Sequence, residues 1–266
     1  MTSITDNFGF LVKIFSGSTV VDFVRYAMAA GALWLFFYVI RRQHWLHRKV
    51  RSGFPRWRDI RREVGLSTLT CVVYGIVAVL SLYAVQHGWT RLYLDIHDYG
   101  WGWFAASIVI TIFFHDAYFY WTHRLMHQPR LFRLMHQGHH RSTNPTPWAA
   151  YAFDPLEAFV QAGIFPLVIF AYPLHPLAFF IFMGWQIAFN VFGHAGFEIF
   201  PRWFLDSWMG KFLNTPTNHA MHHEYFIGNY GLYFNFWDRL MGTNHKDYET
   251  RFREVTSRAK RPASIS

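Results

Sequence analysis

Cysteine and charged residues are scarce in this chain of 266 residues. There is one cysteine, Cys71, and only 15% of the residues are charged, against 52% that are hydrophobic. A single cysteine excludes a disulfide scaffold and any zinc or iron–sulfur site built from several thiolates. The high apolar fraction excludes an intrinsically disordered chain, and the length suits one domain or two. Histidine, by contrast, is abundant: its 16 residues equal Asp and Glu together.

Four stretches carry little or no charge over lengths that can enter a bilayer, where a helix needs about 20 apolar residues. They are residues 20–40, 67–86, 99–122 and 158–197. The last has no Asp, Glu, Lys or Arg, and as one helix it would be roughly 60 Å long, twice a typical hydrocarbon core. Two prolines near its middle, Pro173 and Pro176, predict a turn, and therefore a hairpin that enters the membrane and returns.

These stretches predict an all-α integral membrane protein with about four transmembrane helices, the last two forming a hairpin at the proline turn. The alternative is a soluble protein with buried helices, which a long uncharged run disfavours. The first 18 residues lack a basic start, so we expect the first stretch to be an anchor rather than a cleaved signal.

The basic residues are concentrated in three segments. Residues 41–66 hold nine Lys or Arg, residues 123–157 hold four and the segment from Glu198 holds nine, which together make 22 of the 25. The predicted spans put all three segments on one side, and the positive-inside rule makes that side cytoplasmic, with the N-terminus outside. This distribution accounts for the net charge of +9. No stripe of basic and aromatic residues suggests a base-reading module, so we expect no nucleic-acid partner.

Eight of the histidines fall into three short motifs on the predicted cytoplasmic side. Residues three and four apart share one face of a helix, so we expect each motif to present its imidazoles together. Neutral imidazole is a good ligand for iron, zinc, copper and nickel, and eight imidazoles exceed what one ion can bind. The motifs therefore predict a helical, histidine-rich site for two metal ions, with these ligands: His123 and His127; His136, His139 and His140; His219, His222 and His223.

Other polar residues lie where they can join or support such a site. His194, at the returning end of the hairpin, is a ninth ligand candidate, whereas His175 lies at the outer turn and is excluded. His115 and Asp116 form an ionisable pair inside the third stretch, which indicates a functional role. We expect carboxylates to orient the ligand rings by hydrogen bonds. The candidates are Asp116, Asp154, Glu198, Asp206 and Asp238.

The remaining histidines need no special role, and one further segment suits the membrane surface. Residues 201–212 predict an interfacial helix with Trp203 and Trp208 at headgroup level. The other histidines are interpreted as loop or interface residues: His44, His47, His87, His97 and His245.

The histidine motifs and their surroundings resemble the fatty acid hydroxylase superfamily, and within it the sterol desaturase branch. The resemblance covers about residues 100–245 and divides the chain into an N-terminal membrane region with a basic loop (1–95), a catalytic domain (96–245) and a polar C-terminal tail (246–266). It rests on the sequence His115-Asp-Ala-Tyr-Phe-Tyr-Trp-Thr-His-Arg, the segments 140–147 and 152–157, Asn229-Tyr-Gly, residues 237–243 and the histidine motifs.

This resemblance implies a non-haem di-iron centre that uses O₂ to hydroxylate or desaturate a C–H bond of a sterol-like or acyl lipid. It implies two iron ions, which zinc can replace in purified protein. Some hydroxylases carry His where Asn190 stands, and sterol C5-desaturases carry His at Tyr151 and Asp154, so the resemblance does not fix the reaction or the lipid. The implied ligands are His123, His127, His136, His139, His140, His194, His219, His222 and His223.

The implied chemistry also needs electrons, and the chain shows no haem-binding His-Pro-Gly-Gly segment, cysteine cluster or glycine-rich dinucleotide motif. We therefore expect an external donor of the ferredoxin or cytochrome b5 type, attracted by the basic surface. The lipid would pass aromatic residues of the membrane helices, namely Phe114, Tyr118, Trp185 and Phe189.

Two other classes of function remain open from the sequence. One is a metal-binding membrane protein without oxidase activity, either a transporter or a haem carrier. The other is a zinc hydrolase, which needs a general base beside the ligands. Glu224, directly after His223, is the one carboxylate inside a histidine motif.

Overall fold

The computed structural model describes residues 4–259, and within that range the chain is helical, with isolated β-bridges in place of strands. Four helical segments are long and apolar enough to cross a membrane: Phe8–Ile40, Trp57–Gln86, Gly100–Met126 and Pro176–Gly193. The predicted all-α membrane fold is therefore confirmed. These segments correspond to α1 (Ile4–Trp34) with the π-helical turn η1 (Leu35–Ile40), α3 (Trp57–Gln86), α4 (Gly100–Met126) and α9 (Pro176–Gly193).

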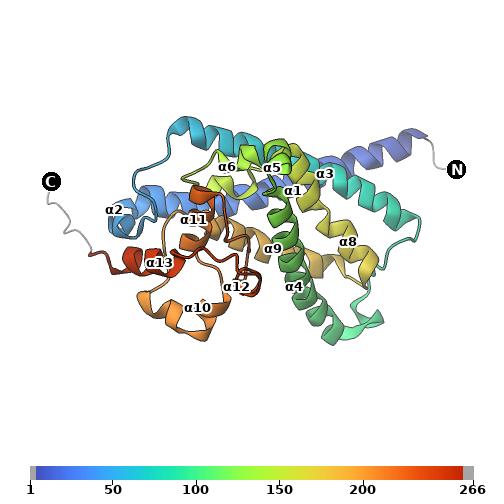
Figure 1. Ribbon diagram of the computed structural model, residues 1–266. Coiled ribbons are helices and arrows are strands. Elements are labelled where there is room, and N and C mark those ends of the chain that lie inside the picture. The colour runs from blue at the N-terminus through green and yellow to red at the C-terminus, as the bar shows by residue number, and fades with distance from the viewer. Residues whose placement is uncertain (1–3, 260–266) are drawn as a thin grey trace.

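Shorter helices connect the long ones, and those of the C-terminal part gather at one end of the molecule. Figure 1 shows α1 beginning on the right of the view and the C-terminal helices grouped on the left. Before the hairpin they are α2 (Arg42–Trp45), η2 (Leu46–Arg48), η3 (Ile96–Asp98), α5 (Pro129–Met135), α6 (Gln137–His140) and η4 (Pro147–Tyr151). From the hairpin on they are α7 (Pro155–Ala162), α8 (Ile164–Ala171), η5 (Arg202–Asp206), α10 (Trp208–Phe212), α11 (Pro216–Tyr225), α12 (Phe236–Leu240) and α13 (Tyr248–Ser257).

The first two long helices begin earlier than the charge pattern indicated. In α1, the hydroxyls of Ser16 and Ser18 donate to carbonyls one turn back, so these polar residues do not interrupt the helix. Asp22 and Arg25 form an ion pair of 2.6 Å within α1, which lets both charges lie along a membrane helix. Helix α3 includes Arg58, Arg61 and Arg62, because Asp59 in its first turn pairs with Arg62 at 3.1 Å.

The proline hairpin is present, but its outgoing arm is broken. Helix α9 starts at Pro176 after the turn at 172–175, and the His175 ring accepts a hydrogen bond from the Leu177 backbone. The outgoing arm consists of two short helices, α7 and α8, that meet at Gly163. There the Tyr118 hydroxyl approaches so closely that a β-carbon on Gly163 would lie 2.9 Å from it. Only the returning arm is thus long enough to cross a membrane.

The loops gather at two opposite ends. At one end, the loop after α3 bonds to the hairpin turn: Arg91 N donates to Ile169 O, and Tyr93 N donates to Leu174 O. His175 lies at this end, where its ring nitrogen is 2.9 Å from Leu94 O.

At the other end, the three basic segments contact one another. Glu198 N donates to Arg48 O, the Arg51 side chain donates to Thr143 O, and Arg258 donates to Lys49 O. The segments that hold most of the positive charge therefore share one end of the molecule, as the positive-inside interpretation requires.

One C-terminal prediction is corrected. The predicted interfacial helix at 201–212 is split into η5 and α10 at Ser207, whose hydroxyl accepts from Gly210 N, although Trp203 and Trp208 are exposed as expected. Within the predicted polar tail, residues 248–257 form α13, which buries Tyr248 and Phe252 in the cluster around Met221. The end of that tail, 260–266, lies outside the described residues.

Candidate metal centre

Nine buried or half-buried histidines meet at the end of the molecule that carries the basic segments. They form two groups, and within each group one ring nitrogen per residue lies within 4.8 Å of all the others. The five-histidine group is His123, His127, His136, His140 and His222; the four-histidine group is His139, His194, His219 and His223. These are the nine residues that the sequence indicated as ligands.

Two of the three motifs, residues 136–140 and 219–223, are each divided between the two groups. His136, directly before α6, and His140, at its end, are four residues apart and join the five-histidine group, while His139 belongs to the other. In α11 the assignment is reversed, because His219 and His223 join the four-histidine group and His222 the five-histidine group. The expectation that each motif presents its imidazoles together holds for His123 and His127, whereas the other two motifs present theirs to two groups. Residues at i and i+4 share a face, and the residue at i+3 is displaced enough to reach a second site.

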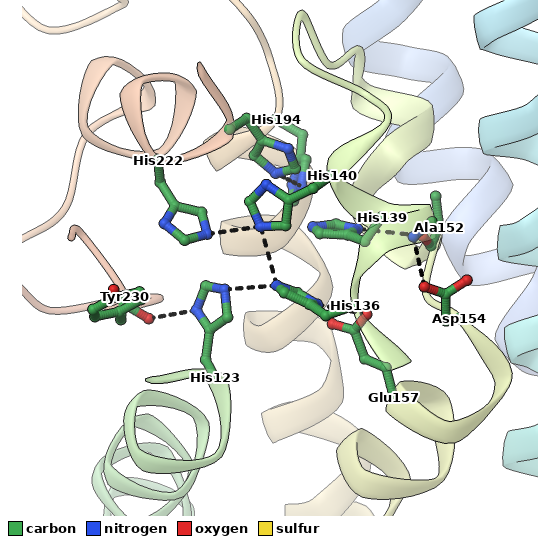
Figure 2. A network of polar contacts seen from close by, with 12 residues as sticks. His123, His136, His139, His140, Ala152, Asp154, Glu157, His194, His222 and Tyr230 are labelled. Atoms are coloured by element: carbon green, nitrogen blue, oxygen red, sulfur yellow. Dashed lines mark hydrogen bonds and ion pairs between the residues drawn. The ribbon is translucent and has the colours of Figure 1, made fainter. Parts of the chain in front are cut away.

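The Nε2 atoms converge within each group (Figure 2). In the five-histidine group, His136 Nε2 lies 3.1 Å from the Nε2 atoms of both His123 and His140. His222 Nε2 is also 3.1 Å from His140 Nε2. In the four-histidine group, His194 Nε2 lies 3.0 Å from that of His219 and 3.2 Å from that of His223.

Backbone carbonyls hold the opposite ring nitrogen of four of these histidines. His123 Nδ1 lies 2.8 Å from Tyr230 O, and His222 Nδ1 lies 2.7 Å from Gly228 O. The corresponding carbonyls in the four-histidine group are Asn190 O for His194, at 2.7 Å, and Ala152 O for His139, at 3.2 Å. A carbonyl only accepts, so each Nδ1 carries the proton and each Nε2 presents a lone pair. Lone pairs that converge in a buried space repel one another unless a cation lies between them, so the donor set fits metal ions.

A buried carboxylate that the sequence analysis missed completes the five-histidine group. Glu157 Oε2 lies 2.8 Å from His136 Nδ1, and both side chains are 1% exposed. Figure 2 shows Glu157 reaching His136 from the first turn of α7. The sequence did contain a signal for this role. Glu157 directly precedes the forty-residue uncharged run, and a carboxylate at the start of a membrane segment is poorly placed to face solvent.

Two predicted carboxylates support the backbone around the ligands. Asp154 Oδ2 accepts from Gly138 N at 2.6 Å and so fixes α6; a β-carbon on Gly138 would collide with this carboxylate. Asp238 accepts from the backbone N–H groups of Tyr230 and Gly231, at 2.9 and 2.7 Å. It thereby fixes the segment whose Tyr230 carbonyl binds His123.

Asp116 and Glu198 also anchor backbone segments near the centre. Asp116 Oδ1 accepts from Tyr233 N and Phe234 N, at 3.0 and 3.2 Å. Glu198 Oε2 accepts from both Thr217 N and its hydroxyl, at the start of α11. These carboxylates thus position loops and helix ends rather than ligand rings.

Of the other predicted residues, some contact the surroundings of the histidine groups and some form ion pairs elsewhere. His115 Nδ1 lies 2.8 Å from the Tyr233 hydroxyl, and Asn190 contributes its carbonyl to His194. Asp206 instead forms an exposed ion pair with Arg253, at 2.6 Å. Glu224, the general base that a zinc hydrolase would require, pairs with Arg251 at 3.5 Å.

The aromatic residues expected along a lipid path have other environments. Trp185 and Phe189 pack in a cluster with Tyr233, Phe114 is 39% exposed, and the Tyr118 hydroxyl donates to Val160 O. The histidines assigned to loops lie where expected; His245, for example, stacks on Tyr225.

Several ligand histidines lie outside the long helices. Burial keeps these histidines in the neutral form, which is the form that binds metals. It lowers the pKa of His127 and of His194 to about 4, although a backbone hydrogen bond opposes the shift in each. Burial likewise holds the pKa of His139, His140 and His223 well below the usual range. The site therefore requires no proton release before a cation enters at neutral pH.

Comparison with known proteins gives one family. The fatty acid hydroxylase family model matches residues 108–243, a range that contains all nine histidines. The chain is 31% identical over 222 residues to Delta(7)-sterol 5(6)-desaturase ERG3B of Gibberella zeae, covering 82% of this chain and 64% of that protein. It is 31% identical over 234 residues to Delta(7)-sterol 5(6)-desaturase erg3C of Aspergillus fumigatus, covering 82% of this chain and 73% of that protein.

A mammalian relative has a similar identity. Lathosterol oxidase of Mus musculus is 32% identical over 191 residues, which cover 70% of this chain and 61% of that protein. The chain thus spans less than two thirds of two of these three relatives. No solved structure matches it. With the family model matched over more than half of its length, the chain belongs to the fatty acid hydroxylase family.

Proposed function

We propose that the protein is a membrane-bound oxidoreductase that uses O₂ to hydroxylate or desaturate a C–H bond of a lipid at a centre of two iron ions. The observation that carries this proposal is the convergence of Nε2 atoms in two buried histidine groups, four of whose rings are fixed by backbone carbonyls. The printed names of the relatives, sterol desaturase and lathosterol oxidase, support a sterol-like lipid.

The residues of the chain would prepare the site for the cations and shield it. The five-histidine and four-histidine groups would each hold one ion, and bound iron would supply the activation of O₂ and the oxidising power. The carbonyls of Tyr230, Gly228, Ala152 and Asn190 keep the ligand rings in the correct tautomer. A cation bound by the five-histidine group would favour the ionised form of Glu157, whose charge beside His136 would then offset part of the charge that neutral imidazoles leave on that cation.

Electrons would come from a separate donor of the ferredoxin or cytochrome b5 type, and zinc can replace iron in purified protein. The metal centre and the C-terminus would face the cytoplasm, because the segments rich in Lys and Arg meet at that end. A topology reporter at the C-terminus tests this orientation, and a lumenal or periplasmic signal there would contradict it.

The two other classes of function find less support. A zinc hydrolase would use Glu224 beside the metal, yet that carboxylate contacts Arg251. A haem carrier would place histidine pairs within facing spans, whereas most of these histidines lie on α6, α11 and the ends of α4 and α9.

The decisive test is lipid mass spectrometry of cells that express the chain or its His140→Ala variant. We expect the wild type to give a lipid product that is heavier by one oxygen atom or lighter by two hydrogen atoms. The His140→Ala variant should give no product, since it removes a ring from the five-histidine group. Identical lipid profiles from cells with the wild type, the variant and no added chain would contradict the proposed function.

A further inference from the structure

An apolar cavity lies between the membrane helices, away from the histidine groups. Its volume is about 250 Å³, and its walls come from α1, α3, α4, α9 and the outgoing arm of the hairpin. Two of its lining residues, Val21 and Phe180, are 48% and 54% exposed, so the cavity reaches the surface that faces lipid. The walls are mostly apolar and include Val77, Ile164, Phe165, Phe179, Phe182 and Met183.

Polar side chains also line this cavity, which is unusual at membrane depth. Asp22, Arg25, Gln161, Gln186 and His115 all line the cavity. Two of their donors, Arg25 Nε and Gln161 Nε2, are buried and have no hydrogen-bond partner. Gln161 is 5% exposed, so water at the surface does not satisfy it. Unpaired donors in an apolar environment are costly, and an acceptor atom in the cavity would remove this cost.

The charge of the wall indicates which acceptor fits. The Arg25 guanidinium is already paired with Asp22 at 2.6 Å, and the two glutamines are neutral. This wall therefore has donors to offer but no net charge. A hydroxyl or keto oxygen matches it, whereas a carboxylate or phosphate would bring a charge that Asp22 repels.

The cavity also shares side chains with the supports of the metal centre. Gln186 Oε1 accepts from the Tyr151 hydroxyl at 2.8 Å, and the next residue, Ala152, binds His139 Nδ1 through its carbonyl. His115 also lines the cavity and contacts the Tyr233 hydroxyl. A molecule in the cavity would thus lie against residues that adjoin both the lipid and the histidine groups.

We propose that this cavity binds a neutral lipid from the bilayer and that Arg25 and Gln161 donate hydrogen bonds to its single hydroxyl or keto oxygen. This inference deepens the proposed function, on which it rests, by naming the class of lipid substrate and the residues that select it.

The test measures equilibrium binding to the purified full-length chain in lipid nanodiscs. The probes are 5α-cholestan-3β-ol, its hydrocarbon analogue 5α-cholestane, and the sulfate ester of the alcohol. We expect the alcohol to bind about 10-fold more tightly than the hydrocarbon, as two modest hydrogen bonds would give, and more tightly than the charged ester. Gln161→Leu should reduce the preference for the alcohol about 3-fold or more. The matched control, Gln86→Leu, changes an exposed glutamine at the end of α3 and should leave the preference unchanged.

A second measurement does not depend on any variant. A diazirine derivative of 5α-cholestan-3β-ol should cross-link to cavity residues such as Phe180 and Met183, identified by peptide mass spectrometry. Equal binding of the alcohol and the hydrocarbon, no binding of either, or cross-links confined to other surfaces would overturn the inference. Because binding is measured without O₂ or reductant, selective binding without lipid oxidation would contradict the proposed function and leave the cavity assignment supported. Lipid oxidation without selective binding would support the proposed function and contradict the cavity assignment.

Discussion

The two histidine groups share two short helices but differ in what supports them. The five-histidine group combines the end of the membrane helix α4 with α6 and α11, and a carboxylate, Glu157, contacts one of its rings. The four-histidine group adds His194 from the end of the hairpin, and its contacts within residues 4–259 are to backbone carbonyls, not to a carboxylate. The comparison shows that one pair of motifs can supply histidines to two neighbouring groups, of which only one has a carboxyl group against a ring among the described residues.

Acidification should have the largest effect because it acts on both groups. The lowered pKa values of His127 and His194, about 4, mean that the neutral rings contribute stability above an unfolded pKa of about 6.5. That contribution is lost as the pH falls from about 6.5 through about 4. We expect both metals to leave together near pH 4 to 5, measured by elemental analysis after buffer exchange. Release of one metal near pH 6.5 would contradict equal protection of the two groups.

Removing one ligand from each group should separate them. His223→Ala should lower the metal content from two ions to about one per chain, and His140→Ala should do the same at the other group. Either change should reduce lipid oxidation at least about 100-fold, because a two-metal reaction needs both ions. Elemental analysis and product formation measure the two effects. Loss of both metals in each variant would show that the groups do not fill independently.

Neutralising Glu157 should affect only the five-histidine group. Glu157→Gln keeps the shape but removes the ionisable carboxyl group beside His136, and such supporting contacts change metal affinity by about 10- to 100-fold. Competition with a chelator measures the affinity of each ion. The matched control is Asp206→Asn, which neutralises an exposed carboxylate far from both groups. If Glu157→Gln lowered the affinity for both ions equally, the proposed difference between the two histidine groups would be contradicted.

Asp238→Asn should give the smallest effect. The change weakens hydrogen bonds to Tyr230 N and Gly231 N and so loosens the carbonyl that holds His123. We expect a loss of about 1–3 kcal/mol in the free energy of unfolding, seen as a lower melting temperature of the purified protein. Glu249→Gln, in the exposed pair with Arg239, serves as the control and should leave the melting temperature unchanged. An unchanged melting temperature for Asp238→Asn would show that this carboxylate does not hold the loop.

The sequence predicted what depends on local spacing and on long apolar runs. The long uncharged stretches predicted the membrane helices and the proline hairpin. The histidine spacing identified eight of the side chains that meet, and the hairpin position of His194 indicated the ninth. The break at Gly163 was not predictable, because it depends on the Tyr118 hydroxyl of a helix far away in the sequence.

The supports of the site were harder to predict than its histidines. Glu157 resembles any helix-starting carboxylate until the fold places it against His136. The division of α6 and α11 between two groups depends on how these helices pack together, which spacing within one motif does not contain.

Helix α11 carries the last histidines of both groups to be synthesised during translation. Four ligands of the five-histidine group precede the hairpin in the chain, whereas the four-histidine group then has only His139. Both groups still wait for α11, which supplies His222 to one and His219 and His223 to the other. A ribosome that stops before residue 219 therefore releases a chain that can insert every membrane helix and yet close neither site. Metal loading would thus be a late event in the biogenesis of this protein, set by the position of one ten-residue helix.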